Sequence, residues 1–558
     1  MMRSSIGTHK RATLIAPLLA VLLCLFSASA VQAYVYKVKP GGTGDGSSWE
    51  KALGERGFIE TLEKSGNGHE FWLAAGSYRP YSVPDSSEDQ RAKDDDTPEK
   101  TPREHSFFLN PGVALFGGFA GNETARSQRD WERNPTILSG VIELPEGTLS
   151  NSYSVVVVSD DFGIPSTMDG LTITGGRAND EGDLGCGGGM RINSGYTRIT
   201  NCHFHDNRGD HGGGLYVKDG APMIRDTLFS DNEGNFGGGV YVEDSSLSIS
   251  DCSFANNRAR SGGGLLTYCA KEDESAAQTA APSIEKSAFY GNVALESGGG
   301  MANWKSSPVI KDVSFSANRS MIEGGGLFNS ECSPRITAST FDSNRSENGG
   351  AITSFDSDPV IINCTFYSNS AAANGGAILN DKSSVIIVNS TFTLNRAAVG
   401  GGMFNFQCSP VVANSILWRD SSEIRSEGGT MTVSYSIVEG GFGGDGNIDE
   451  DPRLGALLNN GGHTDTCLPD PESPAIDSGL AVGTRISGNV AIPATDQRGM
   501  ARPRGEGVDI GACEYSDEPP GPDPRPGGDG GGGCNALGGG ASVLFFLLPL
   551  AFGLTGRK

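Results

Sequence analysis

The sequence predicts an all-β fold, a right-handed single-stranded parallel β-helix with three short strands in each coil of about 25 residues. Eight copies of Ile-x-x-x-x-Phe-x-x-Asn, each followed by a Gly-Gly-[Gly/Ala]-apolar corner, recur every 25 or 26 residues. One insertion of ten residues, around 271–280, interrupts this spacing. A fixed period of this size indicates a solenoid, in which each unit buries its apolar face against its neighbours.

Equivalent residues of successive coils are expected to stack into inward ladders. Each buried Ile or Phe contributes about 1.5–3 kcal/mol, and each Asn amide is expected to bond a corner backbone and the Asn one coil away. The ladders comprise Ile199, Ile224, Ile249, Ile284, Ile310, Ile336, Ile361 and Ile387; Phe204, Phe229, Phe254, Phe289, Phe315, Phe341, Phe366 and Phe392; and Asn207, Asn232, Asn257, Asn292, Asn318, Asn344, Asn369 and Asn395. The pattern decays in capping coils, where these places hold Met168, Ile173 and Gly176 upstream and Val412, Leu417 and Asp420 downstream.

Composition divides the chain into six segments. They are a signal peptide (1–33), N-terminal coils and cap with a polar loop at 85–104 (34–150), the regular repeats (151–440), a C-terminal cap domain (441–515), a Pro/Gly-rich linker (516–533) and a tail (534–558). Small residues after an apolar run predict signal cleavage after Ala33. A helix over 535–555 would be about 30 Å long, enough to cross a hydrocarbon core, so the tail is a predicted transmembrane segment.

The cysteines are mostly predicted to be free, although a secreted chain permits disulfides. Cys202, Cys252 and Cys364 occupy one coil position in coils that are not adjacent. Cys202 and Cys252 would lie roughly 9.6 Å apart, whereas a disulfide needs Cα atoms within about 7 Å. Only Cys467 and Cys513, outside the repeat, remain a plausible bridge.

Charge excludes some partners. The formal net charge of −24 makes nucleic acid and anionic lipid poor ligands, because both require a basic surface. It suits an extracellular surface, and no cofactor is predicted.

Three segments resemble known families. Phe366-x-x-Asn369 followed by Gly-Gly-Ala-Ile378 resembles the repeats of chlamydial polymorphic outer membrane proteins and related pectate-lyase-like β-helices. Residues 451–514 resemble the choice-of-anchor Q domain, and 530–558 are similar to the Synerg-CTERM class of bacterial sorting tails, where Cys534 would be the motif residue. The resemblance implies secretion by the general route and anchoring in the bacterial envelope. The tail would meet the sorting protease or translocation machinery.

Residues that could bind a metal are most concentrated in the segment Cys-His-Phe-His-Asp-Asn at 202–207. Its Phe204 is expected to point inward. Period-two alternation then places His203 and His205 together on the outer face, a spacing that can hold a metal. The alternative is an exposed polar strand edge.

Aromatic residues follow the glycine corners on outward positions, where they are candidates for binding sugar rings or a partner surface. They are Tyr216, Tyr241, Phe328 and Phe404, with Trp304, Phe355 and Phe406 two residues further on. The alternative is that they form strands or lie beneath a flanking loop.

Arginines follow the repeat Asn in five coils, at Arg208, Arg258, Arg319, Arg345 and Arg396. They suit an acidic polysaccharide, but we expect pairing with nearby carboxylates.

Two functional classes remain. The favoured one is a non-catalytic surface adhesin or rod that binds extracellular carbohydrate or another surface protein. The alternative is a carbohydrate-active enzyme, a polysaccharide lyase or glycoside hydrolase. Among outward positions only Lys218 and Glu243 are adjacent and charged, and no catalytic constellation is evident.

Overall fold

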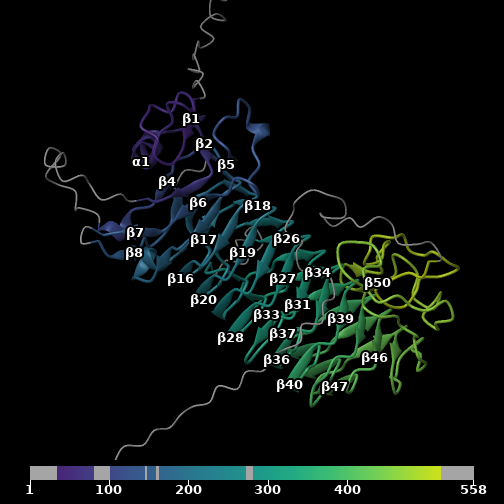
Figure 1. Ribbon diagram of the computed structural model, residues 1–558. Helices are drawn as coiled ribbons and strands as arrows, with labels where there is room; N and C mark the ends of the chain where they lie inside the picture. Colours follow the sequence, from purple (N-terminus) through teal and green to yellow (C-terminus); the bar gives the residue numbers. More distant parts are fainter. Residues whose placement is uncertain (1–33, 81–100, 145–146, 159–162, 272–280, 517–558) are drawn as a thin grey trace, which may run out of the picture.

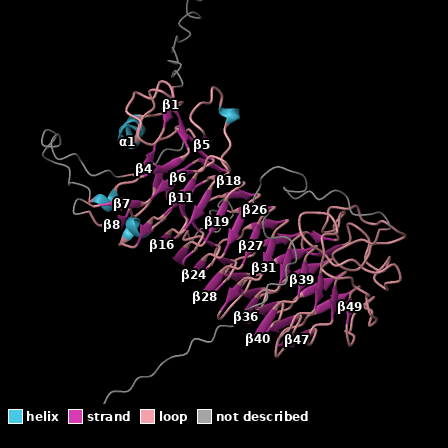
Figure 2. Ribbon diagram, viewed as in Figure 1, coloured by secondary structure: helices cyan, strands magenta, loops and turns pink. Residues whose placement is uncertain are grey.

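The chain forms one long stack of coils (Figure 1). The computed structural model describes residues 34–80, 101–144, 147–158, 163–271 and 281–516. Strands make up the stack, and the helices lie in its N-terminal part (Figure 2). The predicted all-β parallel architecture is therefore confirmed for the described residues.

Each full coil contributes one strand to each of four parallel sheets, named here in their order along a coil. The first sheet contains β1 (Val35–Val38), β2 (Glu70–Ala74), β5 (Ala114–Phe119), β10 (Ser166–Asp169), β14 (Thr197–Thr200), β18 (Met223–Arg225), β22 (Ser248–Ser250), β26 (Ser283–Glu285), β30 (Val309–Lys311), β34 (Arg335–Thr337), β38 (Val360–Ile362), β42 (Ile386–Val388), β45 (Val411–Ala413) and β48 (Thr432–Ser434). The second sheet contains β3 (Gly76–Tyr78), β6 (Thr136–Ser139), β11 (Thr172–Thr174), β15 (His203–His205), β19 (Leu228–Ser230), β23 (Ser253–Ala255), β27 (Ala288–Tyr290), β31 (Ser314–Ser316), β35 (Thr340–Asp342), β39 (Thr365–Tyr367), β43 (Thr391–Thr393), β46 (Ile416–Trp418) and β49 (Ile437–Val438).

The other two sheets flank the glycine corner. The third sheet contains β12 (Arg177–Ala178), β16 (Arg208–His211), β20 (Glu233–Phe236), β24 (Arg258–Ser261), β28 (Val293–Ser297), β32 (Arg319–Ser320), β36 (Arg345–Asn348) and β40 (Ser370–Asn374). The fourth sheet contains β4 (Phe107–Leu109), β9 (Val156–Val158), β13 (Met190–Gly195), β17 (Leu215–Gly220), β21 (Val240–Glu243), β25 (Leu265–Tyr268), β29 (Met301–Trp304), β33 (Leu327–Ser330), β37 (Ile352–Phe355), β41 (Ile378–Asp381), β44 (Met403–Phe406) and β47 (Ile424–Glu427).

Four strands per coil replace the three that were predicted. The corner between β16 and β17 begins at Gly212, whose φ is +68°, a conformation that side chains rarely adopt. At Gly214 an added Cβ would lie 2.6 Å from the carbonyl oxygen of Gly239 in the next coil. The residues between the repeat Asn and this corner therefore form a separate strand, which the prediction did not recognise.

The inward ladders stack as the repeat predicts. Ile199 pairs in register with Ile224, and Phe204 with Phe229. Neighbouring ladder phenylalanines have ring centroids 4.4–5.1 Å apart. All eight rings are fully buried, so they form a continuous apolar core.

The asparagine ladder is a continuous chain of hydrogen bonds. Each ladder Nδ2 donates to the Oδ1 of the next Asn at 2.9–3.1 Å. It also donates to a Phe carbonyl oxygen one coil back, as Asn232 does to Phe204. The ladder begins where the Gly176 N–H donates to Asn207 and ends at Asp420, which accepts from Asn395. These bonds satisfy amides that are fully buried.

The N-terminal end is closed by a helix that the sequence analysis did not predict. Helix α1 (Glu55–Lys64) buries Phe58 and Leu62, which lie one turn apart on one face. Short helical turns η1 (Pro102–Glu104), η2 (Arg126–Gln128) and η3 (Gly182–Gly185) and an antiparallel pair, β7 (Val141–Glu143) and β8 (Leu149–Asn151), complete this part.

A C-terminal cap domain was predicted for 441–515. The first residues of this segment continue the stack, since Ile448 pairs with Ile437 and Phe442 packs on the main core, whereas the later residues lie along the side of the last coils (Figure 1). Val490, Ile492 and Val508 pack on Ile362 and Val388, which point outward from the first sheet. From β10 to β34 the equivalent outward positions are polar, from Asp169 to Thr337, so those coils need no apolar cover there. The segment contains the short pair β50 (Arg485–Ser487) and β51 (Val490–Ala491).

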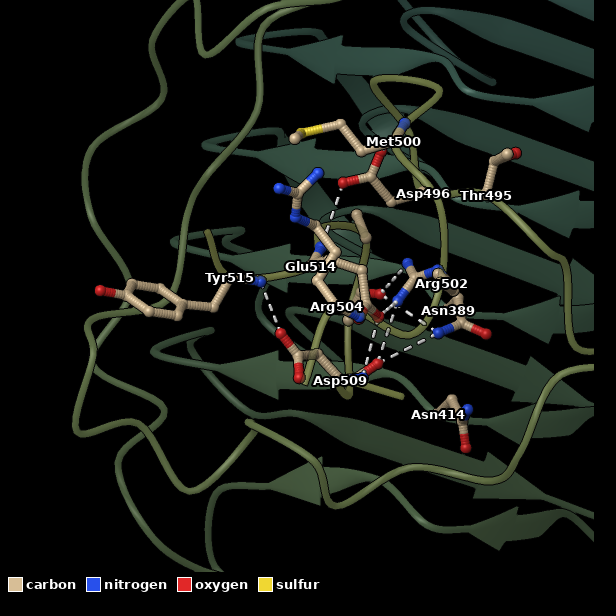
Figure 3. Close-up of polar contacts among 12 residues, drawn as sticks. Asn389, Asn414, Thr495, Asp496, Met500, Arg502, Arg504, Asp509, Glu514 and Tyr515 are labelled. Carbon is tan, nitrogen blue, oxygen red and sulfur yellow. Dashed lines mark hydrogen bonds and ion pairs between the residues drawn. The ribbon is translucent and has the colours of Figure 1, made fainter. Parts of the chain in front are cut away.

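A buried ion pair holds this segment together (Figure 3). Arg502 Nη1 lies 2.5 Å from Glu514 Oε1, and both side chains are fully buried. Arg502 Nη2 also donates to the Gly511 carbonyl oxygen. Asn389, a residue of the β-helix coils, donates to the carbonyl oxygen of Asp509. This hydrogen bond joins the C-terminal segment to the coils.

The cysteines of the described residues are all buried and free, as predicted for most of them. Cys467 and Cys513 form no disulfide. Burial raises the pKa of both thiols to about 12, and each thiolate would disfavour the other. Oxidation requires a thiolate, which this site disfavours.

Several predictions fall outside the described residues. These are the signal peptide with Ala33, most of the loop at 85–104, most of the insertion at 271–280, nearly all of the linker, and the tail with Cys534. Within the described part of the chain, no helix has the length and apolar character needed to cross a bilayer.

Candidate binding site

The candidate site lies on the outer face of the fourth sheet, beside the third. Alternation along β17 buries Leu215 and Val217 inside the coil and turns Tyr216 and Lys218 outward. Parallel pairing repeats this arrangement in each coil, so two outward ladders run along the sheet.

The ladder nearer the third sheet is largely covered. It runs through Tyr216, Tyr241, Leu266, Ala302, Phe328, Thr353, Leu379 and Phe404. Tyr216, Tyr241 and Phe328 are only 5%, 6% and 8% exposed, so the prediction that they are exposed is wrong. His211 of the third sheet packs edge-on against Tyr241, with ring centroids 5.0 Å apart. The unrecognised third sheet thus provides their cover.

The second ladder presents aromatic surface to solvent. It runs through Lys218, Glu243, Tyr268, Trp304, Ser330, Phe355, Asp381 and Phe406. Tyr268, Trp304, Phe355 and Phe406 are each half-buried. Phe236 of the third sheet meets Trp304 edge-on at 5.5 Å between ring centroids, which fixes the orientation of the indole.

Lys218 and Glu243 neutralise each other. Lys218 Nζ lies 2.9 Å from Glu243 Oε1, and the Tyr216 hydroxyl donates to Glu243 Oε2 at 2.9 Å. Both carboxylate oxygens of Glu243 therefore have partners. We assign the Lys218–Glu243 pair a structural role and not a catalytic one.

A carboxyl group that the sequence analysis missed, that of Glu323, lies on the third-sheet side of the glycine corner. Asn348 Nδ2 donates to Glu323 Oε1 at 3.2 Å, but Glu323 Oε2 is buried without a hydrogen-bond partner among the described residues. Burial, with a smaller electrostatic contribution from Asp381, raises the pKa of Glu323 to about 7. Asp381 Oδ1 is likewise buried and unpartnered within the described chain. The sequence carried no signal for this pair, because Glu323 belongs to the unrecognised third-sheet side of the corner.

His203 and His205 are adjacent, as the alternation predicted, with ring centroids 4.6 Å apart. Their ring nitrogens have other partners: His203 Nε2 lies 2.8 Å from Ser230 Oγ, and His205 Nδ1 lies 2.7 Å from Asp206 Oδ2. Burial and the neighbouring His205 lower the pKa of His203 to about 4. Over the described residues, no group of three or more His, Cys, Asp or Glu is arranged to hold a metal, so metal binding stays a prediction.

The expected arginine pairing is found only at Arg208, whose Nε lies 3.1 Å from Glu233 Oε2. Arg258, Arg319, Arg345 and Arg396 are exposed and have no carboxylate within 4.0 Å among the residues that the structure describes. The prediction of general pairing is therefore wrong.

Residues 148–319 and 189–392 match the family model of the right handed beta helix region. This part of the chain is a right-handed parallel β-helix, as the repeat predicted.

Solved structures similar to the chain include enzymes and an adhesin. Pectate lyase Pel9A is 12% identical, with 87% of this chain and 96% of that one covered and a TM-score of 0.34. XylC, solved with xylose, is 8% identical over 87% and 99%, with a TM-score of 0.37. PfbA, a surface adhesin of Streptococcus pneumoniae, is 10% identical over 72% and 90%, with a TM-score of 0.28. No curated protein matches the chain significantly. None of these similarities determines a function.

Proposed function

We propose that the protein is a secreted, envelope-anchored rod that binds glycan or a partner surface without catalysing a reaction. The observation that carries this proposal is the half-buried aromatic ladder of the fourth sheet. Tyr268, Trp304, Phe355 and Phe406 occupy four of six successive coils in register. At about 4.8 Å per coil, they span roughly 24 Å, a length suited to several sugar units.

Rigidity supports a binding role. The aromatic side chains stand on strands whose other faces form the buried core, and Phe236 packs against Trp304. A surface that is already ordered loses little conformational entropy when a ligand binds. Half-buried rings offer an apolar face to a sugar without the cost of ordering a loop.

Placement at the cell surface rests on the sequence. The predicted signal peptide (1–33) would direct secretion, and the predicted tail (534–558) would hold the rod at the envelope. Partners are then extracellular carbohydrate or another surface protein.

The test is a screen of the purified full chain against immobilised neutral and acidic glycans, with soluble products measured in parallel. Binding without product release supports the proposal. Lack of binding to every glycan and to surface-protein extracts, or release of unsaturated or reducing-end products, contradicts it.

One observation favours the alternative, a glycoside hydrolase. Glycosidases use a pair of carboxyl groups, one of them protonated near neutral pH. Burial, with a smaller electrostatic contribution from Asp381, raises the pKa of Glu323 to about 7, and Asp381 stands in register with Phe355 and Phe406 of the aromatic ladder. In this alternative Glu323 would be the general acid. Reducing-end release that disappears in Glu323→Gln but persists in Glu331→Gln, an exposed glutamate of the same coil, would establish it.

A further inference from the structure

A single ladder on the outer face of the third sheet collects arginines. In register it reads Arg177, Arg208, Glu233, Arg258, Val293, Arg319, Arg345, Ser370 and Arg396. Six of these nine positions are arginine and one is acidic, in a chain with 67 acidic and 43 basic residues. The ladder is therefore positively charged, whereas the chain as a whole is negatively charged.

Among the described residues, no carboxylate forms an ion pair with the C-terminal part of this ladder, although the exposed Glu347 lies two residues after Arg345. The arginine row, defined as Arg258, Arg319, Arg345 and Arg396, is exposed, and its members form no ion pair among the described residues. Arg319 pairs directly with Arg345 in adjacent strands, about 4.8 Å apart. Like charges directly opposite one another destabilise a sheet. A bound anion would therefore reduce the repulsion between Arg319 and Arg345.

An aliphatic strip accompanies the arginine row. Leu295 and Met321 lie two residues after the ladder positions of their coils and are 52% and 51% exposed. Ile322, next to Met321, is 47% exposed, and Val399, three coils further along the rod, is 36% exposed. Such a surface suits the aliphatic faces of sugar rings. Single-stranded nucleic acid is bound through stacking on aromatic side chains, and the arginine row and the strip contain none.

We infer that the arginine row is a binding surface for a linear acidic polysaccharide whose carboxylates or sulfates follow the coil spacing. The row extends over five coil steps, about 24 Å, and lies parallel to the axis of the rod. Next to its N-terminal end is an open cavity of about 390 Å³, whose charged lining residues are Arg208, Arg258, Asp231 and Glu233. This surface is on a different sheet from the half-buried aromatic ladder, so each can be tested without the other.

The test measures binding of the purified full chain to polygalacturonate, dextran sulfate, uncharged dextran and oligo-dT at several salt concentrations. We expect a polyanionic polysaccharide to bind with an affinity that falls as salt rises, because association releases counterions. Arg319→Gln/Arg345→Gln is expected to weaken this binding at least about tenfold and to reduce the salt slope by about two. Comparison of polygalacturonate with dextran sulfate separates carboxylate from sulfate recognition.

The matched control is Arg198→Gln/Arg335→Gln, which removes the same charge from exposed positions of the first sheet. It should leave binding unchanged. Three outcomes overturn the inference: neither polyanion binds at low salt, the control loses affinity as much as the row variant does, or oligo-dT binds more tightly than both polysaccharides. Trp304→Ala reports on the aromatic ladder alone, so failure of one surface does not imply failure of the other.

Discussion

Phe254 and Phe289 stack with their rings nearly parallel, at 3°, and their centroids 4.5 Å apart, although 35 residues separate them in the chain. In the sequence, the insertion around 271–280 falls between β25 of the fourth sheet and β26 of the first sheet, and the pairing register is the same before and after it. The core therefore tolerates extra residues between these two strands.

Phe289→Ala is expected to destabilise the rod by about 3–5 kcal/mol, because it removes a fully buried ring and leaves a cavity between two stacked neighbours. Chemical denaturation of the purified protein measures the change. Tyr290→Ala, one residue further on and 42% exposed, is the control and should change the free energy of unfolding by less than about 0.5 kcal/mol. Equal effects of the two substitutions would contradict the ladder.

Asp420→Asn is expected to stabilise the protein above neutral pH. Burial raises the pKa of Asp420, and burial with the nearby Asp420 raises that of Glu423. A carboxyl group with a raised folded pKa contributes stability below its unfolded pKa, near 4, and loses it as pH rises through the folded value. Asparagine would continue the amide ladder without a charge. Thermal unfolding at pH 5 and pH 8 should show a gain that is larger at pH 8, and Asp231→Asn, at an exposed position, should show no such gain.

Trp304→Ala and Phe406→Ala are each expected to weaken glycan binding about tenfold, which corresponds to 1.4 kcal/mol. The half-buried rings contribute little to the main core, so the melting temperature should change only slightly. Tyr290→Ala on the second sheet is again the control. Unaltered binding by both variants would remove the aromatic ladder from the proposed site.

The metal content of the protein is expected to be the same in the wild type and in His203→Ala/His205→Ala. Ser230 and Asp206 already occupy the ring nitrogens that face them. Elemental analysis after dialysis against zinc provides the measurement. A stoichiometric metal lost in the double variant would instead establish the predicted histidine site.

Arg345→Gln is expected to raise the stability of the unliganded protein at low salt, because it removes the repulsion from Arg319. The gain should shrink as salt screens the charges. Thermal unfolding at 20 mM and 500 mM salt tests this, with Arg335→Gln as the control. A loss of stability in Arg345→Gln at low salt would show that the arginine makes a favourable contact.

The inward half of each coil was predictable because its signal is local and repeated. Ile, Phe and Asn at constant spacing define which side chains stack, and the capping residues Met168 and Val412 extend the same register. Helix α1 has a weaker signal, since only Phe58 and Leu62 of its face are buried.

The outward half was predicted less well because exposure depends on neighbouring sheets. Tyr216 and Trp304 were both predicted to face solvent from outward positions, yet Tyr216 is 5% exposed and Trp304 is half-buried. The unpaired state of Arg319 and the electrostatic interaction between Glu323 and Asp381 also depend on how different coils stack, which a single repeat does not show.

The sequence by itself determined the period, the inward ladders and the corner glycines, because each follows from chemistry repeated at fixed spacing. Tertiary structure decided how many sheets a coil has, which aromatic rings reach solvent, where residues 441–516 pack and which charges lack a partner. Those properties depend on what lies one coil away or across a corner, and no single repeat contains that information.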